Sequence, residues 1–151
     1  MAKRILVVDD EIRVLAVIQR RLESVGYEVV TALDGNDALR KARSEKPDLI
    51  VLDLILPGFN GFQICGMLKR DLQFRQIPIL ILSARSQEKD IEEGKHMGAE
   101  AYMTKPYKHE ELLAKIAELL ARAEAEVKQK KEAEEADRKA REQLPGGAKA
   151  G

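Results

Sequence analysis

The stretch RILVVDDE, from Arg4 to Glu11, runs four consecutive aliphatic residues directly into three consecutive acids. The apolar part, Ile5 to Val8, has the character of a strand that is buried on both faces, which is typical of a parallel sheet covered by helices. A carboxylate, in contrast, needs water or a cation. The stretch therefore predicts a central strand whose carboxyl end carries a cluster of negative charge.

Similar apolar runs alternate with amphipathic segments along the chain, and this alternation predicts a doubly wound α/β sandwich built from five β-α units. The predicted strands are Ile5–Val8, Glu28–Ala32, Leu49–Asp53, Ile79–Ser83 and Ala101–Thr104. The predicted helices run from Ile12 to a stop at Gly26, from Gly35 to Ser44, from Phe62 to Asp71, from Glu88 to Met97, and onward from Lys108.

The composition of the 151 residues excludes several classes of protein. Lysine plus arginine balances aspartate plus glutamate at 26 each, so no general attraction to nucleic acid or to an anionic membrane is expected. A single cysteine, Cys65, excludes an intrachain disulfide, and we interpret it as a small core residue. The chain shows neither a signal-peptide core nor a membrane span, so we expect a soluble cytoplasmic protein.

The composition changes near Ala121, where charged residues and alanine replace the large aliphatic residues. We predict a charged helical extension of the last helix over 122–144 and a flexible tail over 145–151. Residues spaced like a dimer seam leave open a second interpretation, a self-associating helix. A nucleic-acid arm is disfavoured, because Lys128 to Glu142 carries six basic and five acidic residues. The seam would contain Leu112, Ile116, Leu119, Ala123 and Val127.

Five charge pairs are expected to support this extension, each an acid followed four residues later by a base. They are Glu124–Lys128, Glu126–Lys130, Glu134–Arg138, Glu135–Lys139 and Asp137–Arg141.

Polar groups follow four of the predicted strands at the edge of the sheet where ligands bind in open parallel sheets. If the first and third strands are neighbours, Asp9, Asp10 and Asp53 converge, and their mutual repulsion calls for a shared cation. Oxygen ligands favour a hard ion such as Mg²⁺. Lys105 and Ser83 add an ammonium and a hydroxyl suited to phosphoryl oxygens, so the set fits phosphoryl transfer to an aspartate.

A purely structural interpretation also exists for the acids that follow the first strand. Acids at the start of a helix cap it and interact favourably with its dipole. We apply this interpretation to Glu11 and allow a contribution at Asp10. His96 and His109 have no partner at ligand spacing and are expected on the surface.

The combination of these motifs resembles the receiver domain of two-component response regulators. The resemblance covers about residues 3–121, with the matching residues in the right order and spacing. It implies a five-stranded parallel sheet of order 2-1-3-4-5 and a receiver domain over 1–121. It is carried by ILVVDDE (5–11), LIVLDLILPGFNGF (49–62), ILILSAR (79–85) and GAEAYMTKPY (98–107).

The resemblance also implies a role for each site residue. Asp53 would accept the phosphoryl group, and Mg²⁺ would be held by Asp10, Asp53 and the backbone carbonyl of Ile55, with Asp9 acting mainly through water. Lys105, Ser83 and the backbone N–H of Ala84 would bind the phosphoryl group. Tyr102 would be the switch residue that turns inward with Ser83, and Lys105–Pro106 would be a cis peptide.

The implied function is a stand-alone signalling switch, and not a turnover enzyme. A sensor histidine kinase or a phosphotransfer protein would donate the phosphoryl group. The signal would pass to a downstream protein through the face made by the fourth helix, fifth strand and fifth helix. A homodimer could form through that switch face or through the C-terminal helix. Ile55 and Arg85 stand at positions that tune the lifetime of the phosphorylated state in this family.

Two alternatives remain open from the sequence. The chain could be a fragment of a larger response regulator whose output domain lies elsewhere. It could also be an aspartyl-phosphate phosphatase of the haloacid dehalogenase class, which likewise uses strand-end aspartates, Mg²⁺ and a lysine. That class usually places a second acid two residues after the nucleophile, where this chain has Ile55.

Overall fold

The computed structural model describes residues 2–144, which form five parallel strands alternating with five helices. The sheet order is β2-β1-β3-β4-β5, as expected from the sequence. The strands are β1 (Arg4–Val8), β2 (Glu28–Ala32), β3 (Leu49–Leu52), β4 (Ile79–Ser83) and β5 (Ala101–Thr104). The helices are α1 (Ile12–Ser24), α2 (Gly35–Glu45), α3 (Gly61–Arg70), α4 (Glu88–His96) and α5 (His109–Glu142).

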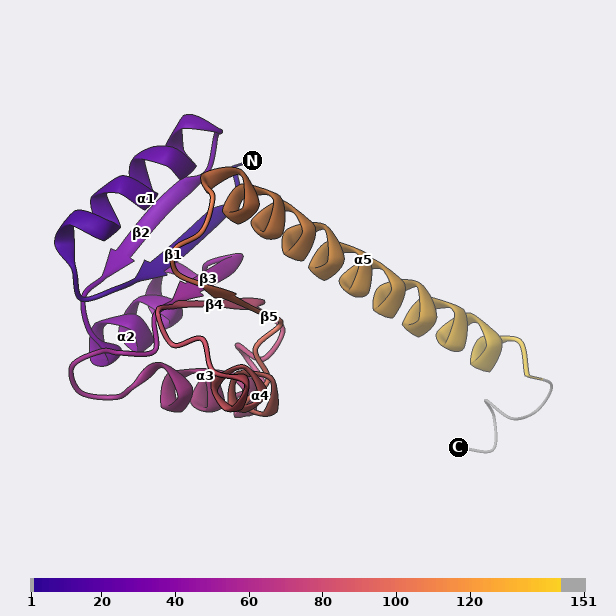
Figure 1. The fold of residues 1–151 in the computed structure, drawn as a ribbon. Coiled ribbons are helices and arrows are strands. Elements are labelled where there is room, and N and C mark those ends of the chain that lie inside the picture. Colours follow the sequence, from indigo (N-terminus) through magenta and orange to yellow (C-terminus); the bar gives the residue numbers. More distant parts are fainter. Residues whose placement is uncertain (1, 145–151) are drawn as a thin grey trace. The chain divides into compact units, whose positions relative to one another are not determined.

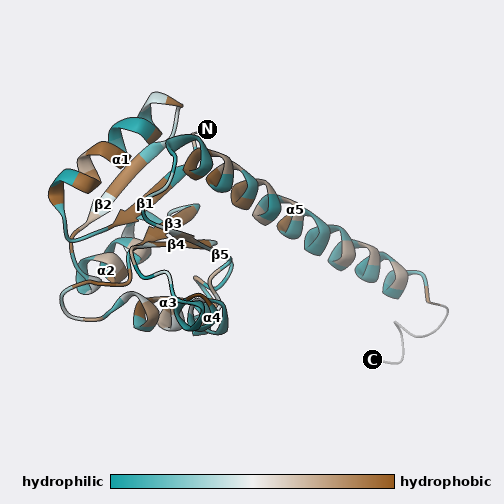
Figure 2. Ribbon diagram, viewed as in Figure 1, coloured by the Kyte–Doolittle hydropathy of each residue, from teal (hydrophilic) through white to brown (hydrophobic). Residues whose placement is uncertain are grey.

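Helices cover both faces of this sheet, with α1 and the first turns of α5 on one face and α2, α3 and α4 on the other (Figure 1). The central strands β1 and β3 are buried along their apolar runs and are brown in Figure 2, which marks hydrophobic residues. Alternate residues of a strand point to opposite faces, so each strand supplies both cores. The pattern ILVV therefore indicated a strand with helices on both sides.

Local signals explain where the helices begin and end. α1 ends in a Schellman motif, in which the N–H of Tyr27 donates to Leu22 and that of Gly26 donates to Glu23, with Gly26 at φ 99°. α3 begins one residue earlier than predicted, because Asn60 and Gln63 form a capping box. Gly61 is needed there, since a Cβ would lie 2.4 Å from the carbonyl oxygen of Asp53.

The second interpretation of the last helix, a self-associating seam, conflicts with the burial of three of its five residues. Leu112, Ile116 and Leu119 are buried in the core between the sheet and the helices on its first face. Because these side chains pack inside their own domain, they cannot also form an interhelical seam. Of the five predicted seam residues, Ala123 and Val127 are left outside that core, and Val127 is 39% exposed.

The chain divides into two compact units between Leu120 and Ala121. In the second unit, residues up to Glu142 are helical, and two of the expected acid–base pairs form, Glu135–Lys139 at 3.4 Å and Asp137–Arg141 at 2.6 Å. The tail predicted over 145–151 lies outside the described residues. Within 2–144, no helix combines the length and apolar character that crossing a membrane requires.

Candidate functional site

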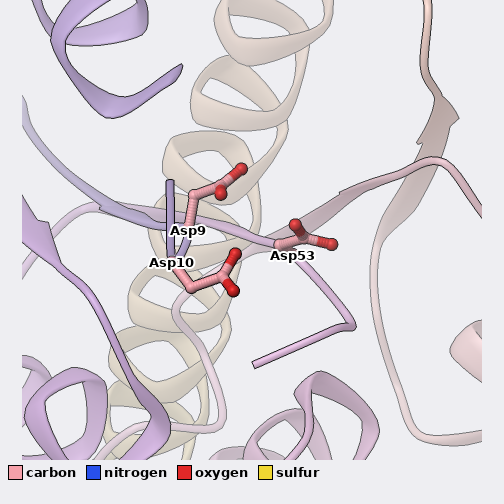
Figure 3. Close-up of side chains that lie close together, drawn as sticks. All are labelled: Asp9, Asp10 and Asp53. Carbon is pink, nitrogen blue, oxygen red and sulfur yellow. The ribbon is translucent and has the colours of Figure 1, made fainter. Parts of the chain in front are cut away.

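Three carboxylates meet at the carboxyl ends of β1 and β3. The register pairs Val8 with Leu52, so the next residues, Asp9 and Asp53, leave the sheet side by side. The Asp53 N–H donates to the Val8 carbonyl at 3.0 Å, which fixes this position. One carboxylate oxygen from each of Asp9, Asp10 and Asp53 lies within 4.8 Å of the others, and Figure 3 shows the three side chains together.

The three acids differ in their burial and in their contacts. Asp9 is 3% exposed and Asp53 is 9% exposed, whereas Asp10 is exposed. The N–H of Glu11 donates to Asp9 Oδ1 at 2.9 Å, and the N–H of Ile55 donates to Asp53 Oδ1 at 3.3 Å. Glu11 occupies the N-cap position of α1, as the structural interpretation expected, but its side chain makes no cap hydrogen bond, which corrects that part of the interpretation.

Lys105 brings a positive charge into this group from the loop after β5. Its Nζ lies 3.0 Å from Asp9 Oδ2 and 3.5 Å from Asp53 Oδ2. The Lys105 N–H donates to the Ser83 carbonyl at 2.9 Å, which anchors the start of this loop to the end of β4. The Lys105–Pro106 peptide is cis.

The pKa values of Asp53 and Lys105 reflect both burial and these contacts. Burial raises the pKa of the Asp53 carboxyl above its ordinary value, and the charge of Lys105 opposes this shift without cancelling it. Burial by itself would lower the pKa of the Lys105 ammonium. The hydrogen bond to Asp9 and the charges of Asp53 and Asp9 outweigh it, so the pKa of Lys105 lies above its ordinary value. Asp9 is therefore the stronger partner of Lys105.

The donor set fits a hard divalent cation. All three side chains offer oxygen, and Mg²⁺ binds to one or two carboxylates together with water and phosphate oxygens. Three carboxylates share a single close ammonium among the contacts described for them, which leaves an excess of negative charge. A cation placed between them would offset this repulsion.

The hydroxyl predicted at the end of β4 lies beside this edge of the sheet. Ser83 is fully buried, and its Oγ accepts a hydrogen bond from the N–H of Arg85 at 3.3 Å. The next residue, Ala84, is exposed. The side chain of Ile55, which follows Asp53 by two residues, is 57% exposed.

Tyr102, on β5, directs its hydroxyl to the loop that follows β4. The hydroxyl donates to the Arg85 carbonyl at 2.6 Å, and the ring packs against the core under α4. Burial raises the pKa of the Tyr102 phenol, as does the charge of Asp90, while a hydrogen bond with Ser83 opposes them. Arg85 thus links the two residues, because its N–H donates to Ser83 Oγ and its carbonyl accepts from the Tyr102 hydroxyl.

The sequence-based reasoning missed an ion pair next to this site. Arg85 Nη2 lies 2.9 Å from Asp90 Oδ1, and the Asp90 side chain is 6% exposed. The guanidinium also lies over the ring of Phe62, 5.9 Å from its centroid. The two charges are five residues apart across a loop, so no helical spacing identifies them as partners. The apolar pattern of α4 gives no sign that an acid faces inward.

Comparison with known proteins identifies the family. The response regulator receiver domain model matches residues 5–117. The chain is 47% identical to the alkaline phosphatase synthesis transcriptional regulatory protein PhoP of Bacillus subtilis over 124 residues, which cover 82% of this chain and 51% of PhoP. It is 41% identical to the protein PilH of Pseudomonas aeruginosa over 118 residues, which cover 78% of this chain and 98% of PilH. The chain spans about half the length of PhoP and of three further transcriptional regulators that it matches.

Solved structures agree with this assignment. The Vibrio cholerae chemotaxis protein CheY4 superposes with a TM-score of 0.75 at 33% identity, covering 79% of this chain and 99% of CheY4. A CheY-like receiver domain protein from Methanospirillum hungatei gives a TM-score of 0.79 at 29% identity, covering 83% of this chain and 99% of that one. The chain therefore belongs to the response regulator receiver domain family of two-component signal transduction.

Proposed function

We propose that this chain is a phosphorylation-activated signalling switch that accepts a phosphoryl group on Asp53. The observation that carries the proposal is the meeting of Asp9, Asp10 and Asp53 within 4.8 Å, with the Lys105 ammonium bound to two of them. Carboxylate nucleophiles form covalent phosphoryl intermediates in several enzyme classes, and positive groups around the transferred phosphoryl stabilise its charge.

The contacts of the three acids favour Asp53 as the acceptor. Asp9 is held at 3.0 Å by Lys105 and at 2.9 Å by the N–H of Glu11. The corresponding contacts of Asp53 are longer, 3.5 Å to Lys105 and 3.3 Å to the N–H of Ile55. A loosely held carboxylate keeps a lone pair available for attack. The raised pKa of Asp53 also makes that lone pair more basic.

The proposal includes a Mg²⁺ ion held by Asp9, Asp10, Asp53 and the backbone carbonyl of Ile55, with Asp9 acting mainly through water. When bound, the ion supplies positive charge that offsets the repulsion among the carboxylates and the phosphoryl oxygens. Asp10 is the exposed member of the cluster, so it is accessible to an ion arriving from solvent.

In the proposed step, one Asp53 oxygen forms a bond to phosphorus. The bond between phosphorus and the imidazole nitrogen of a phosphohistidine breaks, and its electron pair remains on the imidazole. The Lys105 ammonium transfers from Asp9 and Asp53 to a phosphoryl oxygen. The Ser83 hydroxyl and the Ala84 N–H donate hydrogen bonds to the other oxygens, so the new charge is distributed over fixed donors.

The output of the switch is a change in binding by the face of α4, β5 and α5. Ser83 lies at the end of β4, and the Tyr102 hydroxyl donates to Arg85, two residues further on. A movement of Ser83 toward the phosphoryl group would therefore shift the position of Tyr102 on β5. This is a population shift between two states of one fold. The proposed partners are a sensor histidine kinase or phosphotransfer protein and a downstream protein target.

We assign the receiver domain to 1–121 and treat 122–144 as a charged helical extension. The extension exposes charged residues and alanine, with acid–base pairs such as Glu135–Lys139 at 3.4 Å. Such pairs stabilise a solvated helix by a few tenths of a kcal/mol each. Two surfaces are proposed for a homodimer, the switch face and the C-terminal helix, and the burial of three of the five seam residues favours the first.

A second candidate output is transcription, with the receiver joined to a DNA-binding domain. It is favoured by the four relatives named as transcriptional regulators, of which the chain covers about half. The 98% coverage of PilH favours a stand-alone switch instead. The length of the natural reading frame separates the two candidates.

The proposal is tested by incubating the chain with Mg²⁺ and acetyl phosphate and measuring the intact mass. We expect a gain of one phosphoryl group that disappears when a chelator removes the metal. A continuous release of phosphate from generic phosphate esters would instead support the phosphatase alternative. If the intact mass does not increase with Mg²⁺ and acetyl phosphate, phosphorylation is contradicted.

A further inference from the structure

Arg85 connects the proposed site to two helices. Its backbone N–H donates to Ser83 Oγ at 3.3 Å, and its carbonyl accepts from the Tyr102 hydroxyl at 2.6 Å. Its guanidinium lies 2.9 Å from Asp90 on α4 and over the ring of Phe62 on α3. The backbone of Arg85 therefore links the serine to the tyrosine, and its side chain contacts both α3 and α4.

The burial of Asp90 makes its ion pair with Arg85 costly to break. It is 5% exposed in the first turn of α4, and a buried carboxylate that loses its partner carries a large desolvation cost. Arg85 is its ion-pair partner in the described structure, at 2.9 Å. Because the Asp90 carboxylate is buried, departure of the guanidinium would leave it without its ion-pair partner, so the pair holds the loop after β4 against α4.

Gly94 provides the space that the tyrosine ring occupies. It lies one helical turn after Asp90, and a Cβ at Gly94 would lie 3.0 Å from Tyr102 Cδ2 and 3.0 Å from Ile81 Cδ1. The absence of a side chain at Gly94 lets the ring of Tyr102 rest directly on α4, with its hydroxyl within reach of the Arg85 carbonyl.

We propose that the Arg85–Asp90 ion pair holds Tyr102 inward, against Gly94 and the Arg85 carbonyl, while Asp53 carries no phosphoryl group. The inference deepens the proposed function, because it rests on Tyr102 being the switch residue. Arg85 and Asp90 are positioning residues in this scheme. The strength of their ion pair sets the fraction of molecules in which Tyr102 is inward before phosphorylation.

A consequence follows for signalling. Because the ion pair raises the population of inward Tyr102 before phosphorylation, the unphosphorylated chain retains part of its affinity for the downstream partner, and phosphorylation raises that population further. When the ion pair is broken, the ring is released, and a phosphoryl group or its mimic must then bring it inward. The Asp90→Asn variant should therefore respond to phosphorylation more strongly at Tyr102 than the wild type does.

The test is a nuclear Overhauser contact between the Tyr102 ring and the Gly94 Hα protons, measured without metal or phosphodonor. We expect the contact in the wild type and its loss in Asp90→Asn and in Arg85→Ala. Arg85→Lys, which keeps the positive charge, should retain most of it. Glu92→Gln, a neutralised exposed acid on the same helix, is the matched control and should leave it unchanged.

Beryllofluoride, a phosphoryl mimic, gives the second measurement. It should shift the Tyr102 ring resonances at least several-fold more in Asp90→Asn than in the wild type. Unchanged core methyl resonances of Ile5 to Val8 would show that the variant is folded. The exposed position of Arg85, with 46% of its side chain accessible, makes Arg85→Ala a second variant that does not empty the core.

The inference is overturned if the wild-type contact is absent before phosphorylation, or if it persists in both Asp90→Asn and Arg85→Ala. Either result leaves the proposed function standing, provided that intact-mass measurement shows a phosphoryl group on Asp53. The contact in the wild type and its loss in the variants, without any phosphorylation of Asp53, would support the inference and overturn the proposed function alone.

Discussion

The Lys105 ammonium lies 3.0 Å from a carboxylate oxygen of Asp9. Asp53 is a weaker partner at 3.5 Å. The ammonium of Lys105 thus neutralises part of the negative charge that would otherwise attract a metal ion. A cation entering the cluster must compete with this ammonium, and a phosphoryl group on Asp53 would offer it a new partner. The three acids and the lysine act as one electrostatic unit.

Removing this ammonium should strengthen metal binding. In Lys105→Met, repulsion between the ammonium and the ion is lost, so we expect Mg²⁺ to bind about three- to tenfold more tightly, corresponding to ~0.7–1.4 kcal/mol. Isothermal titration calorimetry measures the change. Lys95→Met, which neutralises an exposed lysine near the end of α4, is the matched control. Weaker Mg²⁺ binding in Lys105→Met would show that the lysine does not compete with the ion.

Asp10 should contribute to metal affinity without contributing to stability. Because its side chain is exposed and repels two neighbouring carboxylates, Asp10→Asn should weaken Mg²⁺ binding at least about tenfold without lowering the free energy of unfolding in metal-free buffer. Calorimetric titration and urea unfolding test the two parts. The neighbouring acid provides the comparison, since Glu11→Gln should leave the affinity within about twofold. Equal losses of Mg²⁺ affinity in Asp10→Asn and Glu11→Gln would indicate that net negative charge matters and that Asp10 is not a specific ligand.

The thiol of Cys65 should make stability depend on pH in the alkaline range. Burial raises the pKa of Cys65 from 9.0 to about 11 in the folded chain. A raised pKa means that the stabilisation is present below about pH 9 and is lost as pH rises toward 11, since the unfolded chain ionises first. Between about pH 8 and 10.5 the wild type should lose ~2 kcal/mol more than Cys65→Ala in denaturant unfolding. Parallel pH profiles of the two proteins would contradict this burial effect.

The two parts of α5 should respond differently to truncation of an aliphatic side chain. Ile116 is fully buried, so Ile116→Ala should cost about 2–4 kcal/mol in the free energy of unfolding. Val127 is 39% exposed, so Val127→Ala should cost less than ~0.5 kcal/mol. Urea titration followed by circular dichroism measures both. A similar cost at the two positions would mean that Val127 is buried in solution, as in a helical dimer.

The fold was predictable because its decisive signals are local. ILVV and LIVL indicated strands buried on both faces, and Gly26 ended the first helix, as the Schellman motif confirms. The sheet order depended on family resemblance, because apolar strands such as Ile5–Val8 and Leu49–Leu52 carry no signal for the choice of neighbour. The start of α3 differed by one residue, since its capping box begins at Asn60.

The convergence of the three candidate acids was predictable from the sequence, and their contacts were less so. Asp9, Asp10 and Asp53 follow strands directly, so topology alone brings them together. The preference of Lys105 for Asp9 depends on loop geometry that no sequence pattern encodes. The same holds for the pairing of Arg85 with Asp90 across the loop after β4. The alternative of a seam on α5 stayed open at the sequence level, because helical spacing does not reveal which surface an apolar stripe covers.

The most direct test of the central claim is to locate the phosphoryl group by peptide mapping. The chain is incubated with Mg²⁺ and acetyl phosphate, the acyl phosphate is reduced with borohydride, and the modified peptide is sequenced by mass spectrometry. We expect modification at Asp53, present in Asp10→Asn at a reduced level and absent in Asp53→Asn. Modification at Asp9 or Asp10, or an undiminished mass gain in Asp53→Asn, would contradict it.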